Sequence, residues 1–183
     1  MKICRDRFNI NLALVFLVGW VSGCASDKHH DSHVVSTFRL YQEVKSDPLG
    51  STEEASVFRE HPIKLTVNKE PFLTEKMVKG AKVVDDLGGF ALSIQLDQEG
   101  SWLLEQYSAA NKGRHLLVFS QFVNPGEKNI NAGRWLAAPR IQNHITDGRL
   151  TFTPDASRAE AEQIALGLNN VAKDLGTGEE TKW

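Results

Sequence analysis

A short apolar segment near the N-terminus, residues 12–21, constrains this chain of 183 residues more than any other feature. A helix that spans a bilayer needs roughly 20 apolar residues, so this segment is too short to cross one. Basic residues precede it, and the small residues of Val21-Ser22-Gly23 lead from it to Cys24. This order is typical of a secretory signal peptide, which is removed after export. The sequence therefore predicts a signal peptide over residues 1–23, and a mature chain that starts at Cys24.

The exit from the apolar segment, Val21-Ser22-Gly23-Cys24, resembles the lipobox of bacterial lipoproteins. The resemblance implies cleavage between Gly23 and Cys24 and attachment of a diacylglyceryl group to Cys24, often with a further acyl chain such as palmitate. Each buried methylene contributes about 0.8 kcal/mol, and two or more chains hold a protein firmly on a membrane. Ala25 and Ser26 follow the cysteine, and the absence of an aspartate there favours the outer membrane, with the domain facing the periplasm. An ordinary secretory peptide with a chance cysteine is the alternative.

Cysteine content and charge limit what the mature chain can be. Cys4 leaves with the signal peptide, so Cys24 has no partner within the chain for a disulfide. Stability must then come from an apolar core, and a chain of this length can bury one. Removal of three basic residues and one acidic residue leaves 18 basic and 22 acidic residues, a net charge of -4. This balance gives no reason to expect a nucleic acid as a partner.

The residues after the lipidated cysteine, up to residue 36, are polar and lack apolar periodicity. They predict a flexible tether between the lipid and the fold. The tether contains His29, His30 and His33, which are candidate ligands for zinc or copper. Because no cysteine ligand is near and a tether has little preorganisation, a solvated linker is the preferred interpretation. We predict no cofactor.

Alternating and helical patterns then divide the rest of the chain. Residues 37–61 are interpreted as a strand with an irregular lead-in, residues 62–174 as the main domain, and residues 175–183 as a polar tail. A capping box, in which Ser157 is followed by Glu160, predicts a long final helix. Another helix is expected to begin at Ser101 and to end at Gly113. A helical turn is expected at 74–78, and short helices are among the interpretations of 51–59 and 141–145. Predicted strands cover 38–44, 63–67, 81–86, 90–96, 114–122, 134–138 and 149–153.

The order of these elements predicts an α+β fold. Short strands that follow one another with tight turns favour a mostly antiparallel sheet, and the two amphipathic helices need one face of it to bury their apolar sides. We therefore expect a mostly antiparallel sheet with helices packed on one face.

Residues that could carry catalysis are scattered. His115 and His144 could each act as a base, but no Gly-x-Ser-x-Gly elbow accompanies them. Gly88-Gly89 lacks the following helix and lysine of a phosphate-binding loop. The adjacent residues Asp85 and Asp86 point to opposite faces of a strand, so they mark a strand end better than a cation site. The sequence therefore predicts no enzymatic activity.

Several short motifs in the second half of the chain follow one another in a characteristic order. They are Gly113-Arg114-His115-Leu116-Leu117-Val118-Phe119, Ala137-Ala138-Pro139-Arg140-Ile141, Ile145-x-Asp147-Gly148 with Phe152, and the helix from Ser157 to Leu168. This order resembles the head subdomain of the first periplasmic domain of the SecD/SecDF protein-export subunit. Upstream, Leu92 to Gly100 matches a strand that ends in a glycine before the family's first long helix. The resemblance covers about residues 62–172. It implies the head-subdomain fold and an ability to contact extended polypeptide, for which strand addition at a sheet edge is one route.

The chain also departs from the family pattern. Ser120-Gln121 stands where the family usually has an aspartate, and the loop from Val123 to Gly133 is longer than usual. The family's proton-driven motor resides in transmembrane helices, and the resemblance does not extend to them.

The leading hypothesis is a non-enzymatic, lipid-anchored lipoprotein of the cell envelope that binds protein. The second is a ligand- or metal-binding lipoprotein that uses the histidine tether or a cleft near His144. The third is a hydrolase.

Overall fold

Four antiparallel strands form the largest sheet of the described chain, residues 34–178 of this computed structural model. Their order is β4 (Leu73–Thr74), β1 (Arg39–Gln42), β7 (Leu116–Ser120) and β8 (Arg134–Ala137). The predicted strands at 38–44, 114–122 and 134–138 are confirmed, and the last two pair as the expected hairpin. The expectations for Gly23, Cys24, His29, His30 and His33 lie outside the described residues.

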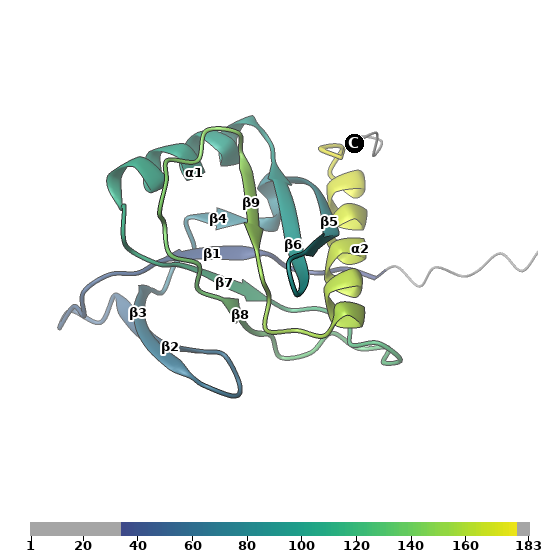
Figure 1. The fold of residues 1–183 in the computed structure, drawn as a ribbon, viewed down its shortest axis with the longest axis horizontal. Coiled ribbons are helices and arrows are strands. Elements are labelled where there is room, and N and C mark those ends of the chain that lie inside the picture. The colour runs from purple at the N-terminus through teal and green to yellow at the C-terminus, as the bar shows by residue number, and fades with distance from the viewer. Residues whose placement is uncertain (1–33, 179–183) are drawn as a thin grey trace, which may run out of the picture. The chain divides into compact units, whose positions relative to one another are not determined.

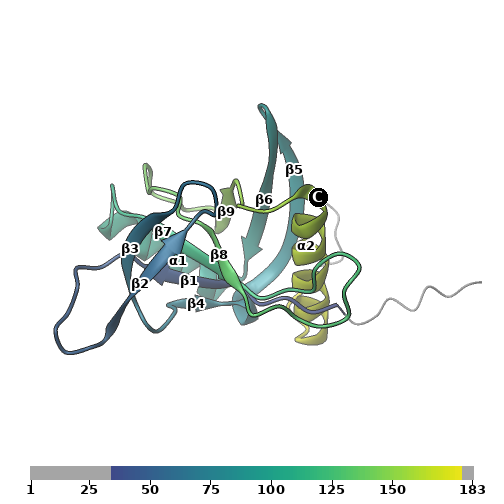
Figure 2. The ribbon, with the colours of Figure 1, turned by 90° about the horizontal axis from the view of Figure 1, so that it is seen from below.

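A second antiparallel sheet contains β5 (Val78–Asp86), β6 (Gly89–Leu96) and β9 (Arg149–Phe152) in that order. Gly88 makes the turn between β5 and β6 at φ +85°, a conformation that glycine adopts without steric cost. The tip of this hairpin stands clear of the other elements (Figure 2). The strands predicted at 81–86, 90–96 and 149–153 are therefore confirmed.

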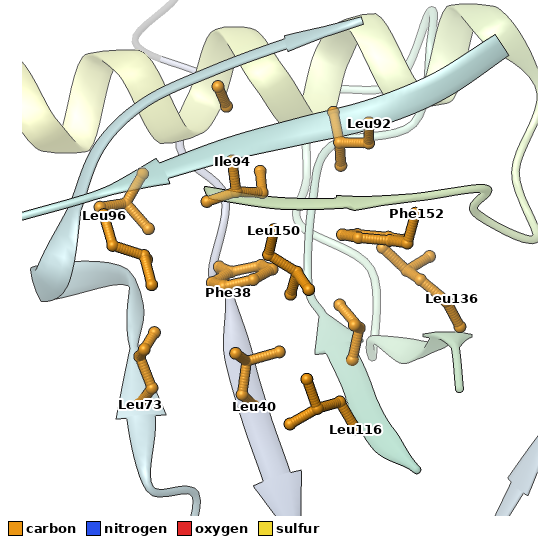
Figure 3. Packing of buried hydrophobic residues seen from close by; sticks show 14 of the residues in the cluster. Phe38, Leu40, Leu73, Leu92, Ile94, Leu96, Leu116, Leu136, Leu150 and Phe152 are labelled. Atoms are coloured by element: carbon orange, nitrogen blue, oxygen red, sulfur yellow. The ribbon is translucent and has the colours of Figure 1, made fainter. Parts of the chain in front are cut away.

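The main core lies between these two sheets. Figure 3 shows Leu92, Ile94, Leu96, Leu150 and Phe152 of the second sheet turned toward side chains of the first sheet and its lead-in. The facing residues are Phe38, Leu40, Leu73, Leu116 and Leu136, and all ten are buried. Successive side chains of a strand point to opposite faces, so Leu92, Ile94 and Leu96 of β6, which alternate with Ser93 and Gln95, all reach this core.

The hairpin of β2 (Thr52–Val57) and β3 (Ile63–Asn68) covers the outer face of the four-stranded sheet. Ala55, Val57 and Val67 pack there with Tyr41 and Leu117 in a second apolar cluster. The strand at 63–67 is confirmed, whereas a helix at 51–59 is wrong. Pairing with β3 makes this segment a strand. Its buried residues, Ala55 and Val57, are two positions apart and therefore lie on the same face.

The first long helix, α1, runs from Gln98 to Ala110. Asp97 is its N-cap, and its side chain accepts a hydrogen bond from the backbone N–H of Gly100 at 2.7 Å. The expected cap at Ser101 is wrong because the helix begins one turn earlier. Asn111 is the C-cap, and Gly113, at φ +89°, lies in the turn that follows. The turn expected at 74–78 is a short 3-10 helix, Glu75–Met77.

The final helix, α2, runs from Arg158 to Asp174 and packs against β5. The capping box is confirmed: the Ser157 side chain accepts from the Glu160 N–H, and the Glu160 carboxylate accepts from the Ser157 N–H at 2.7 Å. Ala161, Ile164, and Leu168 form the buried stripe that the sequence predicts. Neither α1 nor α2 has the length and apolar character needed to cross a membrane, and no other segment of residues 34–178 does.

The chain enters the fold across α2. The Asn170 side chain donates to the carbonyl of Val34 at 2.8 Å, and Ser36 lies directly over Gly167. Thr37 is then fixed to the end of β7, because its N–H donates to the Gln121 carbonyl at 2.9 Å. We call residues 34–38 the entry strap. Together, the antiparallel sheets and the two helices confirm the predicted α+β fold class.

Candidate functional site

A groove of about 260 Å³ lies between β9 and the segment that connects β8 to β9. Its apolar floor is formed by Leu116, Ile141 and Leu150, which are all buried. Polar side chains at the rim include those of Arg140 and Asn143, which are exposed. A groove with an apolar floor and a polar rim is suited to a side chain of a partner that also makes polar contacts.

The connecting segment is held in place by backbone hydrogen bonds. Pro139 lies shortly after β8 and has no backbone N–H to donate. Ile141 then forms backbone hydrogen bonds with the residues just before β7. Its N–H donates to the Arg114 carbonyl at 2.8 Å, and its carbonyl accepts from the Gly113 N–H at 2.8 Å. Further along, the Ile145 N–H donates to the Ser108 hydroxyl at 2.9 Å. These bonds keep 141–145 extended, so a short helix there is wrong.

The edge of β9 that faces the groove is open at one residue. The Leu96 N–H donates to the Gly148 carbonyl at 2.9 Å, which fixes the register of β6 and β9. Because hydrogen-bonded and non-hydrogen-bonded pairs alternate in an antiparallel ladder, the N–H and C=O of Thr151 point away from β6. Thr151 is exposed and lines the groove, and within residues 34–178 its backbone groups have no hydrogen-bond partner.

Three other sheet edges carry some protection. At β5, the Asn169 side chain accepts from the Ala81 N–H at 2.8 Å and donates to the Ala81 carbonyl at 2.9 Å. At β8, the Leu136 carbonyl accepts from the Asp155 N–H at 2.7 Å. The edge strand β2 carries exposed glutamates, a common device against unwanted pairing. Compared with these three edges, that of β9 combines free backbone groups with an apolar groove.

Arg140 is the positively charged residue at the rim. Its Nε donates to the Gly113 carbonyl at 2.8 Å, which fixes the guanidinium beside the groove. No carboxylate of residues 34–178 lies within ion-pair distance of it. Arg149 on β9 adds a second positive charge nearby, and its Nε donates to the Gln95 side chain at 3.2 Å. The groove therefore has a positive rim.

The two histidines considered as bases have separate carboxylate partners. His115 Nδ1 lies 2.8 Å from Glu43 Oε2, and the His115 N–H donates to the same oxygen at 2.6 Å. Burial alone would raise the pKa of Glu43, but these two bonds outweigh it and hold the pKa below its ordinary value. His144 Nε2 lies 3.5 Å from Glu105 Oε1, and both side chains are nearly half exposed. Neither pair includes a serine or cysteine that could act as a nucleophile.

The other residues singled out in the sequence have structural surroundings. Asp85 pairs with Arg158 at the start of α2, and the Asp86 side chain accepts from the Leu87 N–H at 2.8 Å. Both lie at the end of β5, as expected. In the part of the chain from 34 to 178, no group of three or more histidine, cysteine or acidic residues is placed to hold a metal ion. The proposed histidine ligands at 29, 30 and 33 precede this part.

A cleft near His144 is one of the sequence-based hypotheses, and the groove is lined by the neighbouring Asn143 and Ile145, but that hypothesis names none of the groove residues. Pro139, Arg140 and Ile141 belong to one of the motifs that carry the resemblance, and that motif by itself indicates no binding role. No sequence pattern near Thr151 shows that its backbone N–H and C=O lack hydrogen-bond partners, because this depends on which strands lie beside β9. The motif alone could have pointed to the connecting segment, and the fold is needed to place it beside a free edge.

Comparison with known proteins supports the resemblance. The model of the "SecDF, P1 head subdomain" family matches residues 52–172, a range that begins earlier than the motifs suggested and includes β2. Two similar solved structures are described as "Crystal structure of SecDF in Super-membrane-facing form" and "Structure and function of a membrane component SecDF that enhances protein export". Each is 20% identical to this chain, with TM-scores of 0.51 and 0.50.

These likenesses concern one part of longer proteins. The first covers 74% of this chain and 19% of the SecDF chain, and the second covers 75% of this chain and 64% of the other. A search of curated proteins found no significant match. At this level of identity the solved structures establish the fold. The family match extends over more than half of the sequence, and we conclude that the chain belongs to the SecDF P1 head subdomain family.

Proposed function

We propose that this protein is a non-enzymatic module of the bacterial cell envelope that binds extended polypeptide and is held on a membrane through lipid on Cys24. One observation supports the binding role above others: the backbone of Thr151 is unpaired beside an apolar groove. An extended segment that lies along β9 would satisfy both backbone groups and place a side chain over Leu116, Ile141 and Leu150. This is strand addition, in which backbone hydrogen bonds supply affinity and pockets supply specificity.

The binding role is tested by Thr151→Pro. Proline removes the outward N–H of Thr151 and leaves the bonds between β9 and β6 intact, so it is tolerated at an edge strand. The matched control is Thr151→Ser, which keeps the N–H and the hydroxyl that bonds to Ser93. Loss of one backbone hydrogen bond and obstruction of the edge should cost about 1.4 kcal/mol or more, a tenfold rise in Kd.

The affinity of the full chain in detergent for a fluorescent peptide of alternating valine and threonine is measured by fluorescence anisotropy. The parent and Thr151→Ser should bind with similar affinity, and Thr151→Pro should bind at least tenfold more weakly. Thermal melting checks that both variants are folded. Equal binding by parent and Thr151→Pro would count against strand addition at β9.

The lipid anchor is tested by Cys24→Ser. Cys24 is chosen because its thiol lies just after the apolar segment, where a lipoprotein would be lipidated. In a bacterium fed labelled palmitate, the parent should incorporate label and lose its first 23 residues, and Cys24→Ser should remain an unlabelled precursor. Cys4→Ser is the control and should behave as the parent does. Normal labelling of Cys24→Ser would exclude this anchor.

A further inference from the structure

We infer that the groove selects extended segments in which a carboxylate lies next to an apolar side chain, and that Arg140 is the residue that binds the carboxylate. This inference rests on the proposed function and adds the chemistry of the partner. It arises from the combination of a fixed, unpaired guanidinium, an apolar floor and one open strand position.

Arg140 is prepared for bidentate binding. Its Nε is already bonded to the Gly113 carbonyl at 2.8 Å, so the side chain is held while its two terminal nitrogens have no partner among residues 34–178. A guanidinium fork matches the two oxygens of a carboxylate, and a charged pair of this kind is stronger than a neutral hydrogen bond. Because this bond already restricts the side chain, binding costs less conformational entropy than it would for an unbonded arginine.

The groove favours one or two side chains of a peptide over a cofactor. Its volume of about 260 Å³ is below the range of about 300–1,000 Å³ that is common for small-molecule sites. Leu116, Ile141 and Leu150 are 1%, 4% and 4% exposed, so each presents a small apolar surface at the floor of the groove, and a branched aliphatic side chain placed there would lose part of its contact with water. Complete burial of such a side chain contributes about 1.5–3 kcal/mol, and partial burial on this floor contributes a fraction of that.

Charges around the groove decide the sign of the partner. Arg140 and Arg149 are both positive. Asp147, whose Oδ1 accepts from the Arg149 N–H at 3.1 Å, is negative and lies beside Arg149, whereas Glu105 faces His144, so Arg140 is the charged side chain that lines the groove itself. A lysine or arginine in the bound segment would meet like charge at Arg140. A carboxylate would be attracted, whether it belongs to an acidic side chain or to the C-terminus of a chain.

The experiment compares four fluorescent peptides with the same valine-rich extended core. Three are amidated at the C-terminus and carry glutamate, glutamine or lysine beside the central valine. The fourth carries glutamine and a free C-terminal carboxylate, so that it separates the two sources of the charge. Binding to the full chain in detergent is measured by anisotropy at low salt, where surface electrostatics are least screened.

The glutamate peptide should bind the parent about tenfold more tightly than the glutamine peptide, and the lysine peptide should bind most weakly. In Arg140→Gln this preference should disappear, so that the glutamate and glutamine peptides bind this variant with similar affinity. Arg140→Lys should retain part of the preference, because lysine keeps the charge and lacks the fork. Lys128→Gln, which removes a positive charge from the exposed loop between β7 and β8, is the control and should retain all of it.

Tighter binding of the fourth peptide than of the glutamate peptide would also support the inference, with a chain terminus as the ligand. Equal binding of the glutamate, glutamine and lysine peptides would overturn the inference; if Thr151→Pro still weakened all three, strand addition would stand without charge selection. Failure of every peptide to bind the parent would overturn the proposed function and the inference together.

Discussion

Glu43 and His115 form the most tightly hydrogen-bonded charged contact near the start of β7. Both the backbone N–H and the ring of His115 reach the same carboxylate oxygen, at 2.6 and 2.8 Å, and the Arg114 side chain donates to the Glu43 carbonyl at 3.1 Å. The pair therefore fixes the end of β1 to the turn before β7. Its geometry depends on the ionised carboxylate, whose pKa lies below the ordinary value of 4.5.

We expect Glu43→Gln to lower the free energy of unfolding at pH 7 by about 1–2 kcal/mol, because a charged hydrogen bond becomes a neutral one. A carboxyl with a depressed pKa in the folded state stabilises the fold fully above its unfolded pKa and loses this contribution as pH falls through the folded pKa. The difference between Glu43→Gln and the parent should therefore shrink below about pH 4.5. Urea unfolding at several pH values measures it, and a difference that is constant with pH would contradict the assignment. Glu53→Gln, at an exposed position of β2, is the control.

Gly167 shows a second kind of residue-level constraint. A glycine inside a helix normally costs about 1 kcal/mol relative to alanine, yet this one lies in the middle of α2. A Cβ added to it would lie 2.7 Å from the backbone N of Ser36 and 2.8 Å from the carbonyl carbon of Val35. The entry strap crosses the helix at this point because no side chain is there.

Gly167→Ala should therefore destabilise the protein by about 1–3 kcal/mol, the reverse of the effect at an ordinary helical glycine. Glu162→Ala, at an exposed position of the same helix, should stay within about 0.5 kcal/mol of the parent. Chemical unfolding monitored by circular dichroism separates these outcomes. Stabilisation by Gly167→Ala would show that the strap does not pack on α2.

At the scale of whole elements, the sequence predicts best what local chemistry decides. The α2 capping box needs only Ser157 and Glu160, and both of its bonds are present. Asp97 could likewise have been found as the cap of α1, since its bond to the Gly100 N–H is local. Residues 98–101, before Trp102, are small or polar, so no apolar periodicity marks the first turn of α1.

Long-range pairing decides the elements that the sequence misassigned. The segment from Thr52 to Val57 contains two glutamates and an alanine, which favour a helix, but its partner β3 makes it a strand. Ile141 is extended because its backbone bonds to Gly113 and Arg114. The groove depends on both kinds of contact, and it could not be predicted before β9 and the connecting segment were placed side by side.

Docking of α2 gives the sharpest prediction at this scale. Leu168 is completely buried in the main core, and Glu162 is exposed on the same helix. Leu168→Asp places a carboxylate among apolar side chains. The free energy cost is a large fraction of the roughly 5–15 kcal/mol that stabilises a typical domain. The substitution should lower the melting temperature severely or prevent folding, and Glu162→Lys should change it little. Equal melting temperatures for the parent and Leu168→Asp would mean that α2 is not docked.

At the scale of the molecule, the buried residues of the two apolar clusters all lie between Phe38 and Leu168. The fold therefore contains its own core and should need neither the predicted signal peptide nor a lipid. A shortened chain that begins at Ala25 should stay in the supernatant after ultracentrifugation and unfold in one cooperative transition. The test is a thermal scan with two independent probes, since coincident transitions indicate two-state behaviour. Aggregation under every condition tried would show that the preceding residues are needed.

The position of β1 has a mechanical consequence. This first strand is an interior one, bonded to β4 on one side and β7 on the other, and the entry strap leads directly into it. Tension on the N-terminal side of residue 34 that is directed along β1 would act parallel to its neighbours. The bonds to β7, from Arg39 to Gln42, would then be sheared together instead of being opened one after another. A domain pulled in this way resists extraction through a high barrier to forced unfolding, so it would remain folded under loads that peel apart an edge strand.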